Sequence, residues 1–154
     1  MTTKTIEQRL QEVEDRVAIK SIVDTFSNLA DKKDMASVVQ LLTEDADVEF
    51  YFGAALAGSW KGRAEFERAM TGAGASFDST HHINGHQVIE VEGDTASSEL
   101  YCLAIQIASA GGKKTLTTNG VTYSDTLVRQ GDGWKISKRV SRFGWSDTSE
   151  MLAA

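Results

Sequence analysis

The second half of the sequence contains four long stretches in which apolar and polar residues alternate, separated by short turns. The stretches span about residues 81–92, 95–109, 114–130 and 133–145, and the turns contain Glu92-Gly93-Asp94, Gly111-Gly112 and Gly131-Asp132-Gly133. Alternation with a period of two is typical of half-buried strands, and glycine and aspartate in short connections favour hairpins. We therefore predict a meander of long antiparallel strands, whose apolar face needs a covering layer.

The first part of the sequence predicts that covering layer. Apolar residues recur at intervals of three and four over residues 5–31, which is typical of one amphipathic helix. At about 1.5 Å per residue such a helix is close to 40 Å long, enough to lie across a whole sheet. The apolar positions are Ile6, Leu10, Val13, Val17, Ile19, Ile22, Val23, Phe26 and Leu29. The charged residues of its early turns, Asp15 among them, are predicted to form a solvated face.

The region between these two parts is predicted as helix, strand, loop and helix. Asp34 stands where an N-cap belongs, before a helix over about 35–43, and residues 45–52 alternate as a strand. We interpret Gly53 to Gly58 as a loop, followed by a helix that begins near Lys61 and ends before Gly72. The 154 residues are thus predicted to form one α+β domain (1–154), in which helices cover one face of a curved sheet and enclose a cavity for a small ligand.

Charge and composition exclude several classes of function. The formal net charge of −6 and the lack of a Lys/Arg run argue against nucleic-acid binding, because phosphate contacts need a basic surface. No apolar run approaches the roughly 20 residues of a membrane span, and the N-terminus lacks the apolar segment of a signal peptide. Cys102 is the only cysteine and cannot form an internal disulfide, which suits a reducing compartment. We expect a cytoplasmic protein with a small-molecule ligand and no nucleic-acid or membrane partner.

All three histidines, His81, His82 and His86, lie within six positions at the start of one predicted strand. Regular alternation would place residues 82, 84 and 86 on one face and His81 on the other. Neighbouring strand residues cannot ligate one ion together without distortion, and no HExxH or Cys/His spacing accompanies them, so we predict no metal site. Spacing alone leaves His82 open as an ordinary strand residue and Asp31 as a solvated residue at the helix end.

Several short motifs occur in an order and spacing that are informative together. They are Asp15-Arg16-Val17-Ala18-Ile19-Lys20, Leu29-Ala30-Asp31-Lys32-Lys33-Asp34-Met35, Leu42-Thr43-Glu44-Asp45-Ala46, Trp60-Lys61-Gly62-Arg63, Thr80-His81-His82-Ile83, Tyr123-Ser124-Asp125 and Gly133-Trp134-Lys135-Ile136-Ser137-Lys138-Arg139. From about Val13 to Trp145 the chain resembles the SnoaL-like branch of the nuclear transport factor 2-like (NTF2-like) superfamily. The resemblance implies a cone-shaped α+β fold, in which a curved antiparallel sheet wraps around a long N-terminal helix.

The same resemblance implies a set of catalytic residues. Within this branch the pattern is similar to scytalone dehydratase, bile acid 7α-dehydratase and hexachlorocyclohexane dehydrochlorinase, where an Asp closing the first helix pairs with a His opening a long strand. The corresponding residues are Asp31 and His82, with Tyr123 and Arg139 as implied helpers. A carboxylate that accepts from one imidazole nitrogen fixes the tautomer and favours proton uptake at the other nitrogen. Two alternatives stay open: Tyr123 as a core tyrosine, and Arg139 as the partner of a carboxylate such as Asp125.

The predicted substrate-binding residues are mostly aromatic, and they serve equally well as core or as pocket wall. They are Phe26, Phe50, Tyr51, Trp60, His86, Val121 and Phe143. Two of them depart from the family pattern. Phe26 stands where the relatives carry a Tyr or Lys, and Phe50 stands where the scytalone enzyme uses a second tyrosine, with Tyr51 expected on the opposite face.

Three hypotheses for function follow. The first is a cofactor-independent lyase or dehydratase, in which an Asp31–His82 acid/base dyad acts on a cyclic hydroxylated or halogenated metabolite in an apolar pocket. The second is proton transfer like that of a ketosteroid isomerase or polyketide cyclase, which has no leaving group. The third is a non-catalytic binding module or assembly subunit. The resemblance also implies a homo-oligomer, a trimer or a dimer.

Overall fold

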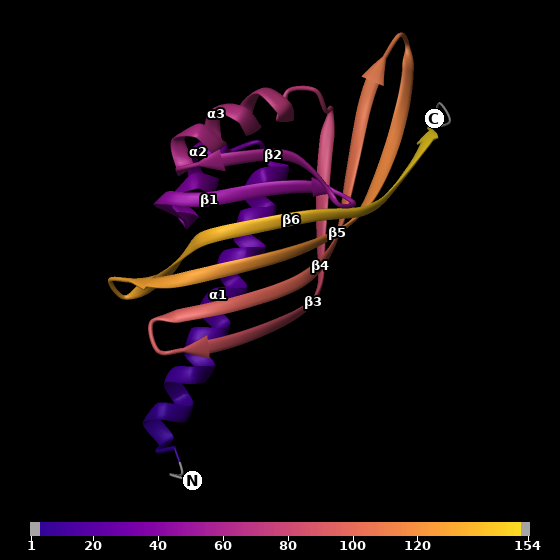
Figure 1. Cartoon of the computed structure of the whole chain (residues 1–154). Helices are drawn as coiled ribbons and strands as arrows, with labels where there is room; N and C mark the ends of the chain where they lie inside the picture. The colour runs from indigo at the N-terminus through magenta and orange to yellow at the C-terminus, as the bar shows by residue number, and fades with distance from the viewer. Residues whose placement is uncertain (1–3, 152–154) are drawn as a thin grey trace.

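The computed structural model describes residues 4–151 and shows three helices, one 3-10 turn and six strands in that part of the chain (Figure 1). In chain order the elements are α1 (Ile6–Asp31), α2 (Met35–Val38), η1 (Val39–Leu41), β1 (Leu42–Phe52), β2 (Ala55–Lys61), α3 (Arg63–Gly74), β3 (Ser79–Glu92), β4 (Thr95–Ala110), β5 (Lys113–Gln130) and β6 (Gly133–Glu150). The predicted long helix and the four-strand meander are both confirmed, each within a few residues at its ends.

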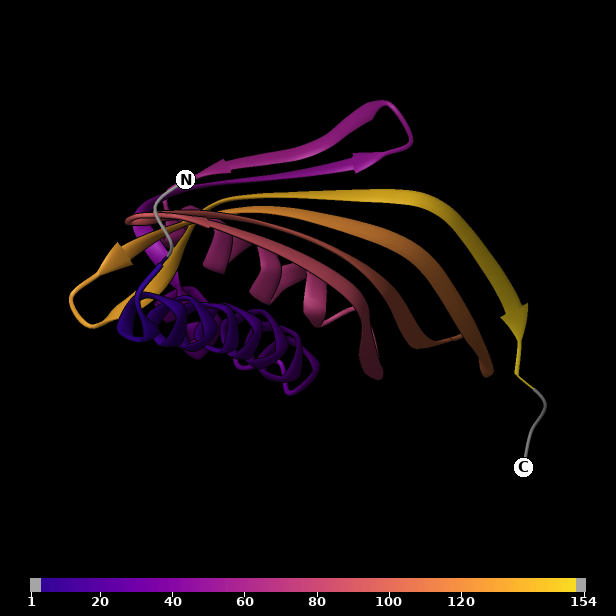
Figure 2. The same cartoon turned by 90° about the horizontal axis from the view of Figure 1, so that it is seen from below.

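The six strands form one sheet in the order β2-β1-β6-β5-β4-β3. Neighbouring strands are antiparallel except for β1 and β6, which run parallel. The sheet is strongly curved and does not close, and Figure 2 shows α1 and α3 on its concave side. This arrangement confirms the α+β class. It also places α1 and α3 on the face of the sheet where a ligand cavity was predicted.

The region between α1 and the meander differs from the prediction in two places. The interpretation of Gly53–Gly58 as a loop was wrong, because Ala55–Lys61 forms strand β2 at the edge of the sheet, paired with β1. Its small residues leave no clear alternation of apolar and polar side chains. Position 58 requires glycine, because the Trp60 ring occupies the space that a Cβ atom would need. The predicted helix over 35–43 is a single turn, α2, which η1 and β1 follow. Its N-cap is confirmed, since the Ser37 backbone N–H donates to Asp34 at 3.1 Å.

Polar contacts hold helix α1 against strand β3 at three positions along the helix. The Arg16 guanidinium donates to the Ile89 carbonyl at 2.5 Å, and the Asn84 amide donates to Asp24 at 3.0 Å. At the C-terminal end of α1, Asp31 contacts His82. These contacts fix the helix against the edge strand of the sheet and thereby fix the position of its last residue.

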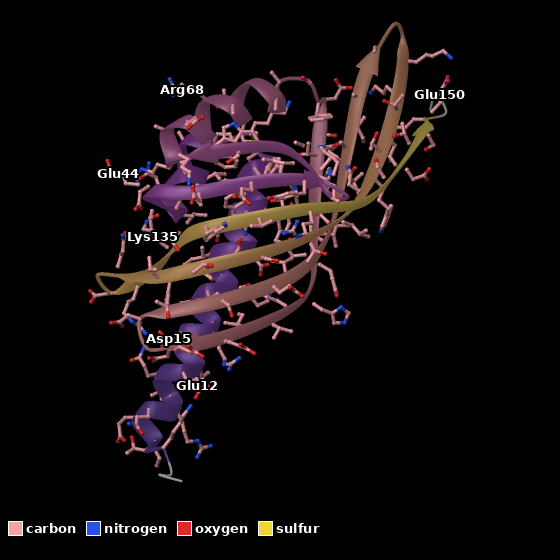
Figure 3. The ribbon with its side chains drawn as sticks, in the orientation of Figure 1. Glu12, Asp15, Glu44, Arg68, Lys135 and Glu150 are labelled. Carbon is pink, nitrogen blue, oxygen red and sulfur yellow. The ribbon has the colours of Figure 1, made fainter. Side chains whose placement is uncertain are left out.

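The prediction of which face of α1 is buried was wrong for the N-terminal half of the helix. Its turns extend past β3 in Figure 1, and the apolar residues Ile6, Leu10, Val13 and Val17 are exposed. Asp15, predicted to be solvated, is instead buried. It accepts two hydrogen bonds from Arg129, each 2.9 Å long, and a third from the Trp134 indole at 3.0 Å. Asp15 lies on α1 in Figure 3 and connects the helix to β5 and β6.

We expect Asp15→Asn to lower the free energy of unfolding by about 1–3 kcal/mol, because the partly buried Arg129 and the buried Trp134 lose an ionised acceptor. The hydrogen bonds from Arg129 hold the pKa of Asp15 below its ordinary value. The stabilising contribution is therefore complete well above the unfolded pKa of about 3.9 and is lost as pH falls through the lower folded pKa. Denaturant titrations at several pH values should show that the wild type loses more stability on acidification than Asp15→Asn. An equal dependence of the free energy of unfolding on pH in the two proteins would contradict this stabilising role of Asp15.

The convex face of the sheet carries a row of exposed apolar side chains. Ile83 pairs with Leu103, Leu103 with Gly120, and Gly120 with Trp145, so the row crosses four strands. Ile83, Leu103 and Trp145 are exposed, and the Trp145 indole lies directly on Gly120, where no larger residue would fit.

No helix among the described residues is long and apolar enough to cross a membrane.

Candidate functional site

The C-terminal end of α1 places the first candidate residue. The Asp34 N–H donates to the Leu29 carbonyl at 3.0 Å and the Lys33 N–H donates to the Ala30 carbonyl at 2.9 Å, which is the pair of bonds of a Schellman motif. Lys33 adopts φ of 59°, the left-handed conformation that this motif requires and that glycine usually supplies. The helix therefore ends at Asp31, with this carboxylate in its last turn.

Strand β3 supplies the partners of that carboxylate. The His82 ring nitrogen Nδ1 lies 2.6 Å from Asp31 Oδ1, and the His82 backbone N–H donates to Oδ2 at 2.9 Å. The Thr80 hydroxyl donates to Oδ1 at 3.1 Å. Three donors thus surround a carboxylate at a helix C-terminus, where the helix dipole alone would disfavour a negative charge. The structure brings Asp31 and His82 together as the sequence predicted.

This geometry fixes the hydrogen positions on the imidazole. An ionised carboxylate can only accept, so Nδ1 of His82 must carry the proton in the neutral ring. The lone pair then lies on Nε2, the ring nitrogen that Asp31 does not contact. Both side chains are largely buried, with 19% exposure for His82 and 23% for Asp31. Such an imidazole can accept a proton at Nε2 while Asp31 stabilises the resulting cation.

His82 lines a cavity of about 260 Å³ between the helices and the concave face of the sheet. Its other lining residues are mostly apolar or aromatic: Phe26, Ala30, Met35, Phe50, Phe66, Met70, Ala73, Gly74, Phe77, Thr80, Ala104, Gln106, Tyr123, Arg139, Ser141 and Phe143. A pocket lined mainly by hydrophobic groups with a few polar ones is typical of small-molecule sites, and its volume lies slightly below the roughly 300–1,000 Å³ of drug-sized ligands.

Arg139 lies in the cavity wall with its charge already balanced. Its Nε and Nη2 donate to the two carboxylate oxygens of Asp125, each at 2.7 Å, and both side chains are almost completely buried. Burial lowers the pKa of Arg139, and the neighbouring Asp125 carboxylate more than offsets this, so the pKa is raised overall. The guanidinium also lies over the rings of Phe26 and Tyr123. Arg139 therefore takes the structural pairing that the sequence left open, while still facing the cavity.

Tyr123 lines the cavity, whereas Cys102 packs beside it in the core cluster around Val23 and Leu100. Both side chains keep their protons at neutral pH. Burial raises the pKa of the Cys102 thiol to about 11 and raises the pKa of Tyr123 well above its ordinary value. A thiol in this state is a poor nucleophile, because the reactive form is the thiolate. A neutral Tyr123 hydroxyl can donate a hydrogen bond, which is the role predicted for it.

Three of the predicted substrate-binding residues line the cavity, namely Phe26, Phe50 and Phe143. Trp60 lies one layer further out, packed edge-on against Phe50 and Phe66 at ring distances of 5.0 and 5.7 Å.

Val121, Tyr51 and His86 also lie outside the cavity lining. Val121 packs in the core cluster around Val23 and Leu100. Tyr51 points away from Phe50, and its hydroxyl donates to Glu49 at 3.1 Å.

His86 is displaced by a β-bulge. Asn84 pairs with Cys102 but Gln87 pairs with Leu100, so two residues of β3 oppose one residue of β4. The bulge reverses the alternation, and Gln87 replaces His86 on the inner side while His86 is exposed. The expectation that residues 82, 84 and 86 share a face was therefore wrong for His86. Within residues 4–151 no group of three or more His, Cys, Asp or Glu side chains is arranged to hold a metal ion.

Sequence reasoning missed several lining residues, chiefly Met70, Ala73 and Gly74 of α3, together with Gln106 and Ser141. A signal for Ser141 was available, because Arg139, Ser141 and Phe143 alternate along one strand and therefore share a face. The α3 residues had no such signal, since the spacing of a short helix does not show which face meets a cavity.

The model of a family described as "SnoaL-like domain" matches residues 11–140. The chain belongs to this SnoaL-like family. An uncharacterised protein of Mycobacterium tuberculosis is 28% identical over 129 residues, which cover 84% of this chain and 85% of that protein.

Solved structures show the same fold. A protein from Novosphingobium aromaticivorans, proposed to be a scytalone dehydratase, matches with a TM-score of 0.77 and 22% identity over 93% of both chains. A hexachlorocyclohexane dehydrochlorinase matches with a TM-score of 0.75 and 17% identity over 95% of both chains. An NTF2-like protein with a cystatin-like fold, also from N. aromaticivorans, matches with a TM-score of 0.74 and 23% identity over 92% of both chains. This SnoaL-like chain therefore has the NTF2-like fold.

Proposed function

We propose that this SnoaL-like protein is a cofactor-independent lyase that removes water from a small cyclic hydroxy ketone. The observation that carries the proposal is the 2.6 Å contact between His82 and Asp31 at the wall of an apolar cavity. The family and the dehydratase-like and dehydrochlorinase structures of the same fold support a general dehydratase or isomerase type of role. The substrate and the roles of individual residues are part of the proposal.

The proposed reaction is an elimination. Nε2 of His82 takes a proton from the carbon between the carbonyl and the hydroxyl-bearing carbon, and the electron pair of that C–H bond forms a C=C bond. The C–O bond to the hydroxyl group breaks, and the departing hydroxide takes the proton from the His82 imidazolium and leaves as water. The neutral Tyr123 hydroxyl stabilises the developing enolate or the departing oxygen. Acid/base work of this kind supplies about 10²–10⁴-fold per group.

The cavity favours a neutral ligand of one or two rings. Its volume of about 260 Å³ is small, and its wall is largely aromatic. Arg139 is the lining guanidinium, and Asp125 already balances its charge. A site without unbalanced positive charge offers little to a carboxylate or phosphate, so a hydroxy ketone fits better than an anion.

The test uses 3-hydroxy-1-tetralone, a bicyclic β-hydroxy ketone whose dehydration gives 1-naphthol, which is fluorescent. We expect the wild-type protein to form 1-naphthol faster than buffer or heat-unfolded protein does. Mass spectrometry should find a product lighter than the substrate by one water. A product of unchanged mass would favour the isomerase alternative, in which the same dyad moves a proton without a leaving group. Recovery of the bound compound unchanged after long incubation would contradict catalysis.

The second candidate is a non-catalytic binding module. Phe26 and Phe50 favour it, because both line the cavity at positions where the resemblance implies a polar helper. The same incubation separates the two candidates, since a binding module retains the compound without converting it.

Association into a homo-oligomer also stays a prediction. The exposed row of Ile83, Leu103 and Trp145 on the convex face supports it, because soluble monomers rarely expose large contiguous apolar patches.

A further inference from the structure

We infer that the Ser141 hydroxyl binds an uncharged oxygen of the ligand, and that it is a specificity-determining residue of the cavity. The inference deepens the proposed function by naming the group that the cavity recognises, and it rests on that function for the identity of the cavity as the ligand site. Its test measures binding rather than turnover.

Ser141 is a completely buried polar residue without a partner. Its exposure is 0%, and its hydroxyl has no hydrogen-bond partner among the described residues. Buried hydroxyl groups nearly always have a partner, because an unmade hydrogen bond forfeits the solvation of the group. The residue lines the cavity, so a ligand atom in the cavity can supply that partner.

The surroundings of Ser141 define the chemistry of that ligand atom. Ser141 pairs with Phe50 on β1 and with Tyr123 on β5, so an aromatic ring lies on the strand at each side. Two residues earlier on the same face, Arg139 uses Nε and Nη2 for Asp125. A hydroxyl beside a neutralised ion pair and two aromatic rings is suited to an uncharged carbonyl or hydroxyl oxygen on a ring compound.

Thr43 provides a matched control. It is the other residue of the described chain whose buried hydroxyl has no partner, and it is 3% exposed. Thr43 does not line the cavity. Thr43→Val therefore removes the same kind of group at a place where no cavity ligand can reach it.

The experiment compares the affinities of 1-tetralone and tetralin, which differ only in the ketone oxygen, by isothermal titration calorimetry. We expect the wild type and Thr43→Val to prefer 1-tetralone by about fivefold to tenfold, the usual worth of one hydrogen bond. Ser141→Ala should bind both compounds about equally. A wild type without the preference, or a Ser141→Ala variant that keeps it, would overturn the inference.

Thermal unfolding without ligand excludes a purely structural role. Ser141→Ala should melt at the same temperature as the wild type or higher, because it removes an unpartnered buried hydroxyl; a clear decrease would count against the inference. The binding measurement and the turnover measurement can fail independently, so failure of this inference can be told apart from failure of the proposed function. Serine-dependent binding without 1-naphthol formation contradicts catalysis alone, whereas turnover with binding that ignores Ser141 contradicts this inference alone.

Discussion

His82→Ala is expected to lower the rate of 1-naphthol formation from 3-hydroxy-1-tetralone by about 10²–10⁴-fold, the usual contribution of a general base. The variant loses Nε2, the basic nitrogen beside the apolar cavity, and nothing else in the lining is placed to replace it. His82 is not part of either hydrophobic core cluster, so the variant should remain folded. Fluorescence of 1-naphthol, followed over time, measures the rate. Circular dichroism of the protein checks that the variant is folded.

Asp31→Asn should lower the same rate for a different reason. The amide that replaces one carboxylate oxygen can donate to Nδ1 of His82, which would move the ring proton to Nε2 and block proton uptake there. The matched controls are His81→Ala, an exposed neighbour on β3, and Asp24→Asn, a carboxylate of α1 that binds Asn84 on β3. Both controls should keep near-normal rates. Nearly full activity in His82→Ala or Asp31→Asn would contradict the proposed mechanism.

Asp125→Asn is expected to cause the largest loss of stability, about 3–5 kcal/mol, because it leaves Arg139 as an uncompensated buried charge. The two side chains are 0% and 2% exposed and share two hydrogen bonds of 2.7 Å. Arg139 also lies against the rings of Phe26 and Tyr123, and neither side chain carries a negative charge that could replace the lost carboxylate. Denaturant unfolding monitored by tryptophan fluorescence measures the loss.

Glu150→Gln is the control for the buried pair. Glu150 pairs with Lys113 at 2.9 Å near the exposed end of β6 (Figure 3), and surface pairs contribute about 0–1 kcal/mol. The double variant with Arg139→Met and Asp125→Leu should recover most of the lost stability, since apolar residues of similar size remove both charges. Asp125→Asn with wild-type stability would show that Arg139 does not depend on this carboxylate.

The fold could be predicted where the pattern is strong. Strict alternation with Gly and Asp in the turns predicted the meander, and apolar spacing predicted the length of α1. The alternation of apolar and polar residues did not predict β2, because the strand contains small residues. Gly58 is one of them, and the Trp60 ring leaves no room for a side chain there. The pattern also failed at Asp15, because the partners of this carboxylate, Arg129 and Trp134, are more than a hundred residues away along the chain.

The site was predicted in part and for two different reasons. The position of Asp31 follows from local chemistry, since the helix ends in a Schellman motif there. Its contact with His82 joins residues 51 apart, and only the resemblance to SnoaL-like enzymes pointed to it. His86 was misplaced because a bulge in β3 depends on the register with β4, which one strand's sequence does not reveal.

The most direct test of the central claim measures proton removal alone. In D₂O the protons next to the carbonyl of 1-tetralone exchange slowly with solvent, and proton NMR follows the loss of their signal. We predict that the wild-type protein accelerates this exchange over buffer and that His82→Ala does not. Exchange that the wild type does not accelerate, or that His82→Ala accelerates equally, would contradict the account of His82 as a base oriented by Asp31.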